Sequence, residues 1–182
     1  MIKTELVWEM DRIVQIVSDN LLAQLQAAQP GTVGINFQFG PPTEIKHQLS
    51  LLGKGERRAE KWPSIFLYRP YTEGAGSGEY ETVKLTMLIV NYTTSSRLSR
   101  DRQIENFEPI LLPIYKELMR QIARSSFFVV MNPATDMRHT KLLHDYFGKD
   151  STPEPKRVLH DFADVIEIRD LELKLSNSQY CC

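Results

Sequence analysis

The chain has 182 residues, of which 42% are hydrophobic and 25% are charged, and its formal net charge is −1 at pH 7. These values are ordinary for a globular protein of one domain that is long enough to bury a core. The near-zero net charge excludes tight binding to nucleic acid or to a membrane through bulk electrostatics alone.

Targeting and cross-linking signals are missing from the sequence pattern. The only cysteines, Cys181 and Cys182, are adjacent, so they offer no disulfide framework. Residues 1–11 mix acidic with apolar side chains and lack the basic-then-apolar layout of a secretory signal. No apolar run reaches the length needed to span a bilayer. We expect a cytoplasmic protein without a membrane contact and with a flexible tail over 176–182.

The first half of the chain predicts one helix and three strands. Apolar residues repeat at helical spacing over 4–28, and Pro30 with Gly31 ends this helix. Strict alternation predicts a strand over 33–39. Residues 40–61 form a long loop containing a short strand or helical turn. Strands follow over 65–69 and 80–90, and we expect them to pair across the loop at 71–79.

The glycine-rich run Gly74–Gly78 does not predict a phosphate site, because a dinucleotide fingerprint needs a strand before it and a helix after it. The apolar stripe over 102–124 predicts the second main helix. Because an interior proline removes a hydrogen bond, we expect a short helix or turn up to Phe107. The main helix then starts near Glu108, and Pro113 kinks it.

The last third of the chain predicts three more strands and a long loop. Residues 126–131 form a short buried strand, 132–158 a long irregular loop, and 159–168 and 171–175 a closing pair of strands. The whole chain, 1–182, is therefore expected to be a single α+β domain, with two main helices packed on a mixed or antiparallel sheet.

Histidines and aspartates near the C-terminus are the only pattern that suggests catalysis: His139, His144, Asp145, His160, Asp161 and Asp164. Such side chains coordinate zinc, but their spacing fits no metalloprotease motif. No nucleophile elbow and no P-loop are present in the sequence. We favour scattered surface residues and expect no catalytic residue, no metal and no cofactor.

Two basic clusters lie in predicted loops: Lys54, Arg57, Arg58 and Lys61, and then Arg97, Arg100 and Arg102. Acidic neighbours dilute both clusters, so solvated loop charge is the favoured interpretation. The alternatives are contacts between subunits or the lining of a passage for DNA, where phosphate contacts are independent of sequence. For the large aromatic residues we favour core packing, with anchoring at an interface as the alternative; they are Trp8, Trp62, Tyr68 and Tyr71.

Four stretches carry a resemblance to a known family: Trp62–Tyr68 (WPSIFLY), Val83–Val90 (VKLTMLIV), Asn106–Leu118 (NFEPILLPIYKEL) and Asp161–Leu175 (DFADVIEIRDLELKL). Their order resembles the α+β domain of tail-terminator (tail-completion) and neck proteins of long-tailed bacteriophages. The resemblance implies a non-enzymatic virion protein, assembled in the bacterial host cytoplasm.

Such proteins form homo-oligomeric rings, commonly hexamers, at the end of the tail tube or at the head–tail junction. The resemblance therefore implies copies of this chain, tail-tube proteins and neck or connector proteins as partners. Double-stranded DNA would pass through the central channel. Two alternatives remain open: a bacterial α+β binding or accessory protein outside a virion, and a metal-dependent hydrolase using His139, His144 and Asp145.

Overall fold

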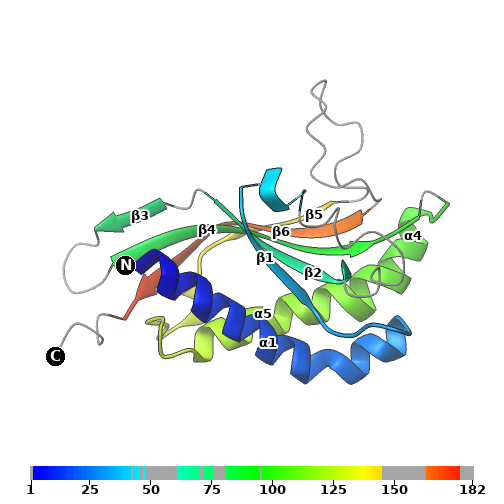
Figure 1. Ribbon diagram of the computed structural model, residues 1–182, viewed down its shortest axis with the longest axis horizontal. Helices are drawn as coiled ribbons and strands as arrows, with labels where there is room; N and C mark the ends of the chain where they lie inside the picture. Colours follow the sequence, from blue (N-terminus) through cyan, green and yellow to red (C-terminus); the bar gives the residue numbers. More distant parts are fainter. Residues whose placement is uncertain are drawn as a thin grey trace.

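The computed structural model describes residues 2–41, 43–45, 47, 61–69, 72–75, 81–94, 96–144 and 163–176. Its elements are α1 (Ile2–Ala28), β1 (Asn36–Gly40), β2 (Ser64–Tyr68), β3 (Thr72–Ala75), β4 (Glu81–Tyr92), α4 (Ser99–Arg102), η2 (Gln103–Leu111), α5 (Leu112–Arg124), α6 (Pro133–Asp136), β5 (Thr140–His144) and β6 (Ala163–Leu175). The helices α1 and α5 lie side by side below the sheet in Figure 1. The predicted α+β class is confirmed.

The sheet has six strands in the order β1-β2-β4-β6-β5, and β3 pairs with a further part of β4. β1 and β2 are parallel, whereas all other pairs are antiparallel. The predicted pairing of the strands at 65–69 and 80–90 is confirmed, with Ile65 opposite Ile89. β1 and β5 form the outer edges of the described sheet, and the long strands β4 and β6 form its centre.

The predicted first helix is confirmed as α1. Its inner face is an apolar stripe at steps of three and four residues, and the buried members are Leu6, Val7, Met10, Ile13, Val14, Val17 and Leu25. α1 packs antiparallel to η2 and α5, and polar contacts join the helices along their length. Asn20 donates to Glu117 at 2.9 Å, and Gln24 donates to the Pro109 carbonyl at 3.4 Å.

The predicted strand over 33–39 is shorter in the structure and begins only at Asn36. The amide of Ile35 donates to Ser18 Oγ on α1 at 3.0 Å, so this residue is bound to the helix. Gly34 makes that approach possible, because a Cβ there would lie 2.9 Å from the same oxygen. Val33 is 62% exposed. The close contact with α1 therefore shortens the strand.

Two predicted loops contain strands, so these predictions are wrong in part. Within the loop expected at 71–79, Thr72–Ala75 pairs with β4 as β3. Within the loop expected at 132–158, Thr140–His144 pairs with β6 as β5, and Pro133–Asp136 is a short helix. Backbone pairing explains both strands, because the long strands β4 and β6 extend far enough to pair with β3 and β5, respectively. The loop at 40–61 is described only at its ends.

The predicted strand at 126–131 and the closing pair of strands are also corrected. Only Phe128 of the first segment bridges the sheet, opposite Leu175. The closing pair is one continuous strand, β6. A bulge lets it continue: the register shifts between Leu85 and Met87, and Asp170 opposite has a φ of 53°. The extra residue restores the inward direction of the following leucines.

The second helical region starts earlier than predicted and is not interrupted. It runs from Ser99 to Arg124 as α4, η2 and α5. η2 is a π-helix that contains Pro109, and Leu112 at its end donates to the Phe107 carbonyl five residues back. The wider turn accommodates a residue without an amide hydrogen. Pro113 lies in the first turn of α5, where proline is tolerated.

Apolar side chains cover both faces of the sheet. The face toward α1, η2 and α5 carries the larger cluster, with Leu67, Met87 and Leu173 among its buried members. The opposite face carries a second cluster, whose buried members are Ile45, Trp62, Phe66, Leu88, Val90, Ala163 and Val165. Two apolar faces explain why the four residues Met87–Val90 of β4 are all apolar: Met87 and Ile89 belong to the first cluster, and Leu88 and Val90 to the second.

Candidate functional site

The first predicted basic cluster is described at a single residue. Lys54, Arg57 and Arg58 lie outside the described residues. Lys61 is only 6% exposed, and its Nζ lies 5.1 Å from the centre of the Trp62 ring. This contact is a cation–π interaction at the edge of the second apolar cluster. Lys61 is thus packed against the sheet.

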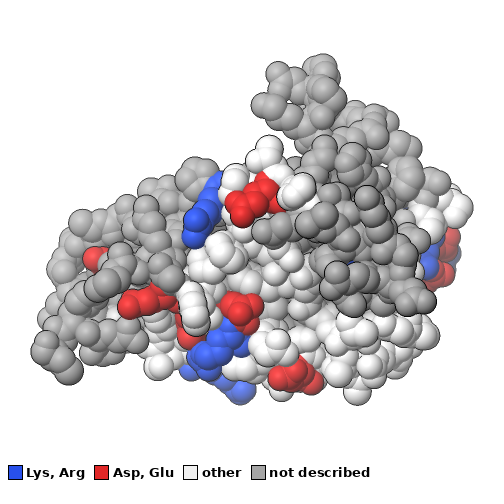
Figure 2. Space-filling view, in the orientation of Figure 1, with Lys and Arg blue, Asp and Glu red and all other residues white. Residues whose placement is uncertain are grey.

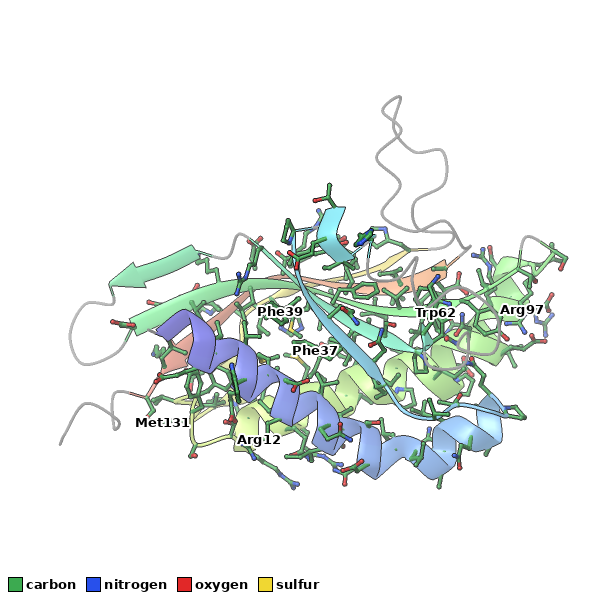
Figure 3. All side chains as sticks on the ribbon, viewed as in Figure 1. Arg12, Phe37, Phe39, Trp62, Arg97 and Met131 are labelled. Atoms are coloured by element: carbon green, nitrogen blue, oxygen red, sulfur yellow. The ribbon has the colours of Figure 1, made fainter. Side chains whose placement is uncertain are left out.

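The second basic cluster divides between the surface and the interior. Arg97 forms an ion pair with Glu105 at 3.1 Å, and both side chains are accessible. Arg100 is exposed on α4. The predicted loop position is wrong for Arg100 and Arg102, since both belong to this helix. Figure 3 places Arg97 and Trp62 toward the same end of the molecule.

Arg102 is buried, so both the favoured solvated position and the alternative of facing a partner or a channel are wrong for this residue. Its side chain is 2% exposed, and Nη1 lies 2.8 Å from Oδ1 of Asp164. Asn106 donates to the second oxygen of Asp164 at 2.8 Å. The 61 residues between arginine and aspartate hid this pairing from the sequence pattern, in which Asp164 was a metal candidate.

The ion pair belongs to a buried network that joins three parts of the fold. Asn91 of β4 donates to Asn106 Oδ1 at 2.9 Å and to Gln29 Oε1 at 2.9 Å. Asn106 and Asp164 connect η2 to β6. The carboxylate receives hydrogen bonds from both neighbours, so its charge is compensated within the chain. We infer that this network fixes the helix against the sheet.

The described metal candidates lie apart, each with its own partners. His144 contacts Glu167 at 2.6 Å, and Asp164 belongs to the buried network. His139 contacts the Met137 carbonyl through Nδ1 at 2.8 Å. Among the described residues no three potential ligands are grouped. Asp145, His160 and Asp161 lie outside them.

The hydrogen bonds of His139 determine which of its ring nitrogens carries the hydrogen in the neutral side chain. A carbonyl only accepts, so Nδ1 carries a hydrogen, and in the neutral ring Nε2 accepts from the Tyr115 hydroxyl at 2.7 Å. Burial raises the pKa of Tyr115, which keeps this hydroxyl protonated. The pair belongs to the lining of an apolar groove on α5, and Lys141 lies 4.8 Å from the centre of the Tyr115 ring. Among the described residues, no carboxylate forms a hydrogen bond or ion pair with these two side chains.

The outer edge of β1 is the first surface that the structure leaves open. The Asn36 amide donates to the Pro63 carbonyl, and the Gly40 carbonyl accepts from the Arg69 amide. Residues 36, 38 and 40 therefore direct their backbone groups toward β2. Alternation along a strand directs those of Phe37 and Phe39 outward. No described strand pairs with them.

The side chains of this edge are apolar or uncharged. Phe37 and Phe39 stack with their ring centres 6.4 Å apart, and Arg69 lies 5.1 Å above the second ring. Phe39 is 40% exposed. Figure 3 shows both rings beside α1. The sequence marked this strand by its alternation, but it did not show that the strand has no outer neighbour.

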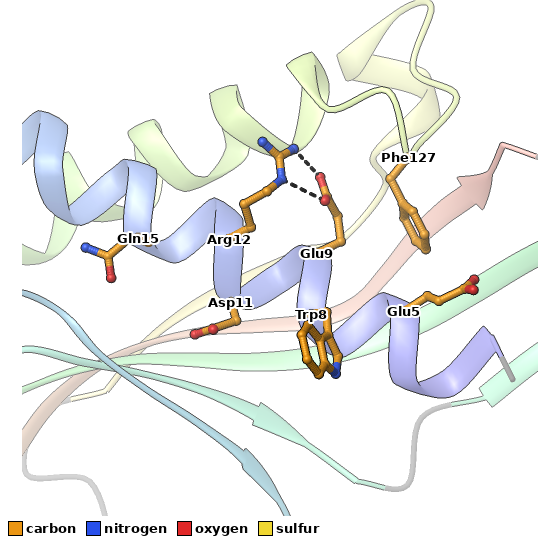
Figure 4. A pocket seen from close by; sticks show the side chains of 7 residues that line it. All are labelled: Glu5, Trp8, Glu9, Asp11, Arg12, Gln15 and Phe127. Carbon is orange, nitrogen blue, oxygen red and sulfur yellow. Dashed lines mark hydrogen bonds and ion pairs between the residues drawn. The ribbon is translucent and has the colours of Figure 1, made fainter. Parts of the chain in front are cut away.

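The outer face of α1 is the second open surface. Trp8 is 74% exposed, which contradicts the favoured core role, whereas Trp62 is buried as predicted. A hollow of about 780 Å³ adjoins this face, lined by Glu5, Trp8, Glu9, Asp11, Arg12, Gln15 and Phe127 (Figure 4). The signal was available in the sequence: Trp8 lies off the apolar stripe, among acidic residues.

Acidic side chains outnumber basic ones on this face of α1. Glu9 and Arg12 neutralise each other at 2.6 Å. Burial alone would raise the pKa of Glu9, but hydrogen bonds from Arg12 and Ser125 outweigh it and lower this pKa. Glu5, Asp11 and Asp19 remain exposed. In Figure 2, acidic side chains recur along the lower part of the molecule, where Figure 1 shows α1.

Comparison with known proteins identifies no family. No protein-family model matches the chain, and no curated protein matches it significantly. None of the described helices combines the length and the apolar character required to cross a membrane. The class established by the structure is therefore an α+β protein with a mixed sheet.

Proposed function

We propose that this chain is a non-enzymatic structural subunit of a bacteriophage particle. In this proposal, copies of the chain assemble into a ring, commonly a hexamer, at the head–tail junction or at the end of the tail tube. Tail-tube and neck proteins contact the ring, and double-stranded DNA passes through its channel. The resemblance of the four sequence stretches to tail-terminator and neck proteins supports the phage assignment.

The observation that carries self-assembly is the open edge of β1. Soluble proteins usually protect an edge strand with charge, proline or a covering segment. β1 has the sequence NFQFG, without a charged residue or a proline, and its two phenylalanines direct backbone groups outward. An extended segment of a neighbouring subunit could add to this edge and hydrogen-bond to it.

The buried polar groups support the same conclusion from the opposite side. The Arg102–Asp164 pair is enclosed by its own chain, and His139 contacts Tyr115 and a carbonyl. These groups stabilise the fold and need no substrate to satisfy them. The large apolar side chains that remain open to solvent, such as Trp8 and Phe39, lie on the surface, as expected for a protein that acts through contacts with neighbours.

A proline scan of β1 tests assembly. Proline at Phe39 removes an outward amide hydrogen and leaves the pairing with β2 intact, whereas proline at Gln38 removes one that points toward β2. We expect wild-type protein to form discrete rings in light scattering and electron microscopy. We expect Phe39→Pro to fold but to assemble weakly, and Gln38→Pro to be destabilised. Phe39→Ala removes the aromatic side chain and keeps the backbone amide, so it separates the effect of the side chain from the effect of the amide.

The phage assignment has its own test. Mass spectrometry and immunolabelling of purified particles from the source phage should place the chain at one end of the tail tube. A wild-type chain that stays monomeric at all concentrations and is missing from particles would overturn the proposal. That result would favour the alternative of a binding or accessory protein outside a virion.

A further inference from the structure

A groove of about 440 Å³ runs along the flank of α5 that points away from α1. Glu117 faces α1, because Asn20 donates to it. Tyr115, Met119 and Ala123 recur at steps of four residues and therefore occupy a different face of the same helix. Together with Met137 they form an apolar lining.

The rim of this groove is positively charged. Arg124 forms no ion pair with any described residue, and Lys141 lies 4.8 Å above the Tyr115 ring without an acidic partner in the described chain. Arg120 is already paired with Glu117. Both ring nitrogens of His139 are already used, in contacts with the Tyr115 hydroxyl and the Met137 carbonyl. An occupant with apolar and acidic groups would therefore suit the groove.

The outer face of α1 has this composition. Trp8 is a large exposed apolar side chain, and Glu5 and Asp11 lie three residues before and after it on the same helix. In Figure 4, Trp8 and Asp11 project from one side of α1, whereas the Glu9–Arg12 pair projects from another. A helix with an aromatic anchor and flanking charges is a common ligand for an apolar groove.

We propose that the α5 groove of one copy receives the outer face of α1 from a second copy, with Trp8 inserted between Tyr115 and Met137. Glu5 and Asp11 would then lie near Arg124 and Lys141. This inference rests on the self-assembly proposed above and identifies its contact surfaces. Because the two surfaces differ, the contact is head-to-tail, and such contacts generate rings when the rotation closes.

The position of the two surfaces agrees with this arrangement. The groove lies on the side of α5 opposite to α1, so one subunit can present its groove and its α1 face at the same time. The hydrogen bond from the Ile35 amide to Ser18 places the residue before β1 against the buried side of α1, so it leaves the outer face of that helix uncovered.

Two substitutions test the contact from its two sides. Trp8→Ala removes the anchor, and Ala134→Glu places a negative charge at an exposed position of the groove lining. We expect each to raise the concentration for half-assembly by at least about tenfold in analytical ultracentrifugation. Leu98→Ala is the matched control, because Leu98 is 72% exposed and belongs to neither surface.

Mixing the two variants gives the sharper result. The Trp8→Ala chain keeps its groove, and the Ala134→Glu chain keeps its α1 face, so one intact contact remains between them. We expect dimers in the mixture and monomers in each separate sample under the same conditions. A charge exchange gives a second readout: Asp11→Arg and Arg124→Glu should each weaken assembly, and the double variant should recover it.

The outcomes separate this contact from the proposed function. Wild-type rings that persist unchanged in Trp8→Ala and Ala134→Glu would overturn the α1–groove contact and leave ring assembly intact. A mixture that never exceeds the monomer would overturn it as well, provided that both variants retain the wild-type circular dichroism spectrum. A wild-type chain that is strictly monomeric would overturn the ring itself.

Discussion

The Arg102–Asp164 network and the outer face of α1 differ in which side chains they bury: the network buries polar groups, whereas α1 exposes an apolar one. In the network, charged and amide groups are buried and bonded to one another. On α1, a tryptophan is 74% exposed among acidic side chains. The first region is enclosed by its own chain, whereas the second leaves a large apolar side chain in solvent. The first therefore stabilises the subunit, and the proposed assembly would cover the second with a neighbouring copy.

The largest expected effect is loss of the buried ion pair. Asp164→Ala leaves the Arg102 charge buried without its carboxylate, and such losses lower the free energy of unfolding by about 3–5 kcal/mol. Urea denaturation followed by circular dichroism measures this change. The double variant Arg102→Met/Asp164→Leu should recover most of the stability, because it removes both charges and keeps volume.

The exposed pair Arg97–Glu105 is the matched control for that experiment. Both side chains are accessible, so Arg97→Ala should change the free energy of unfolding by less than about 1 kcal/mol. Equal effects of Asp164→Ala and Arg97→Ala would contradict the distinction between a closed interior network and a solvated surface.

A smaller effect is expected at the junction between α1 and β1. Gly34→Ala places a Cβ 2.9 Å from Ser18 Oγ and should disturb the hydrogen bond from Ile35. We expect a loss of about 1–3 kcal/mol in the free energy of unfolding. Val33→Ala is the control, because Val33 lies in the same segment and is 62% exposed. Faster hydrogen exchange at Ile35 should accompany the first variant alone.

Glu117, which lies between α1 and α5, should make the stability of the protein depend on pH. Burial alone would raise the pKa of Glu117, but hydrogen bonds from Gln121, Asn20 and Arg120 lower it below 4.5. Because the pKa of Glu117 is lower in the folded chain than in the unfolded chain, its carboxylate stabilises the folded state at any pH above the unfolded pKa. This contribution is lost as the pH falls below 4.5 and through the folded pKa. We expect about 1 kcal/mol.

Unfolding at a series of acidic pH values measures that contribution. The wild-type protein should lose stability more steeply below pH 4.5 than Glu117→Gln, which has no carboxyl group to protonate. Parallel curves for the two proteins would show that Glu117 titrates alike in the folded and unfolded chain.

The smallest effect is expected for Trp8. In dilute monomeric protein, Trp8→Ala should change the free energy of unfolding by no more than about 0.5 kcal/mol, because the side chain is mostly exposed. Thermal denaturation measures it. A loss as large as that of a core residue would mean that Trp8 supports the subunit itself, and the contrast between the two regions would fail.

Local periodicity was enough to predict α1, and closeness in the sequence was enough to predict the pairing of β2 with β4. The general expectation that large aromatic residues are buried held for Trp62 and failed for Trp8. Local periodicity failed where a distant partner decides the outcome. β3 and β5 are strands because β4 and β6 offer them backbone partners, and Asp164 is an ion-pair residue because Arg102 lies beside it. The break expected before Pro109 is absent, because the wider turn of a π-helix accommodates a proline that an α-helix would not.

The candidate surfaces were accessible to sequence reasoning only in outline. The alternation around Phe37 and Phe39 marked a strand, but position at the edge of a sheet is a property of the whole topology. Trp8 could have been recognised as exposed from its place outside the apolar stripe of α1. The groove on α5 required the segment around Met137 to fold back against the helix, which no local pattern records.

The central pairing of β4 with β6 has a consequence for biosynthesis. Residues 93–162 separate these strands, so a ribosome must translate all of them before the middle of the sheet can close. A nascent chain that stops short of Ala163 would expose the flank of β4 and hold Arg102 without its aspartate. Prematurely terminated products would thus be targets for chaperones and proteases, and quality control could remove them early.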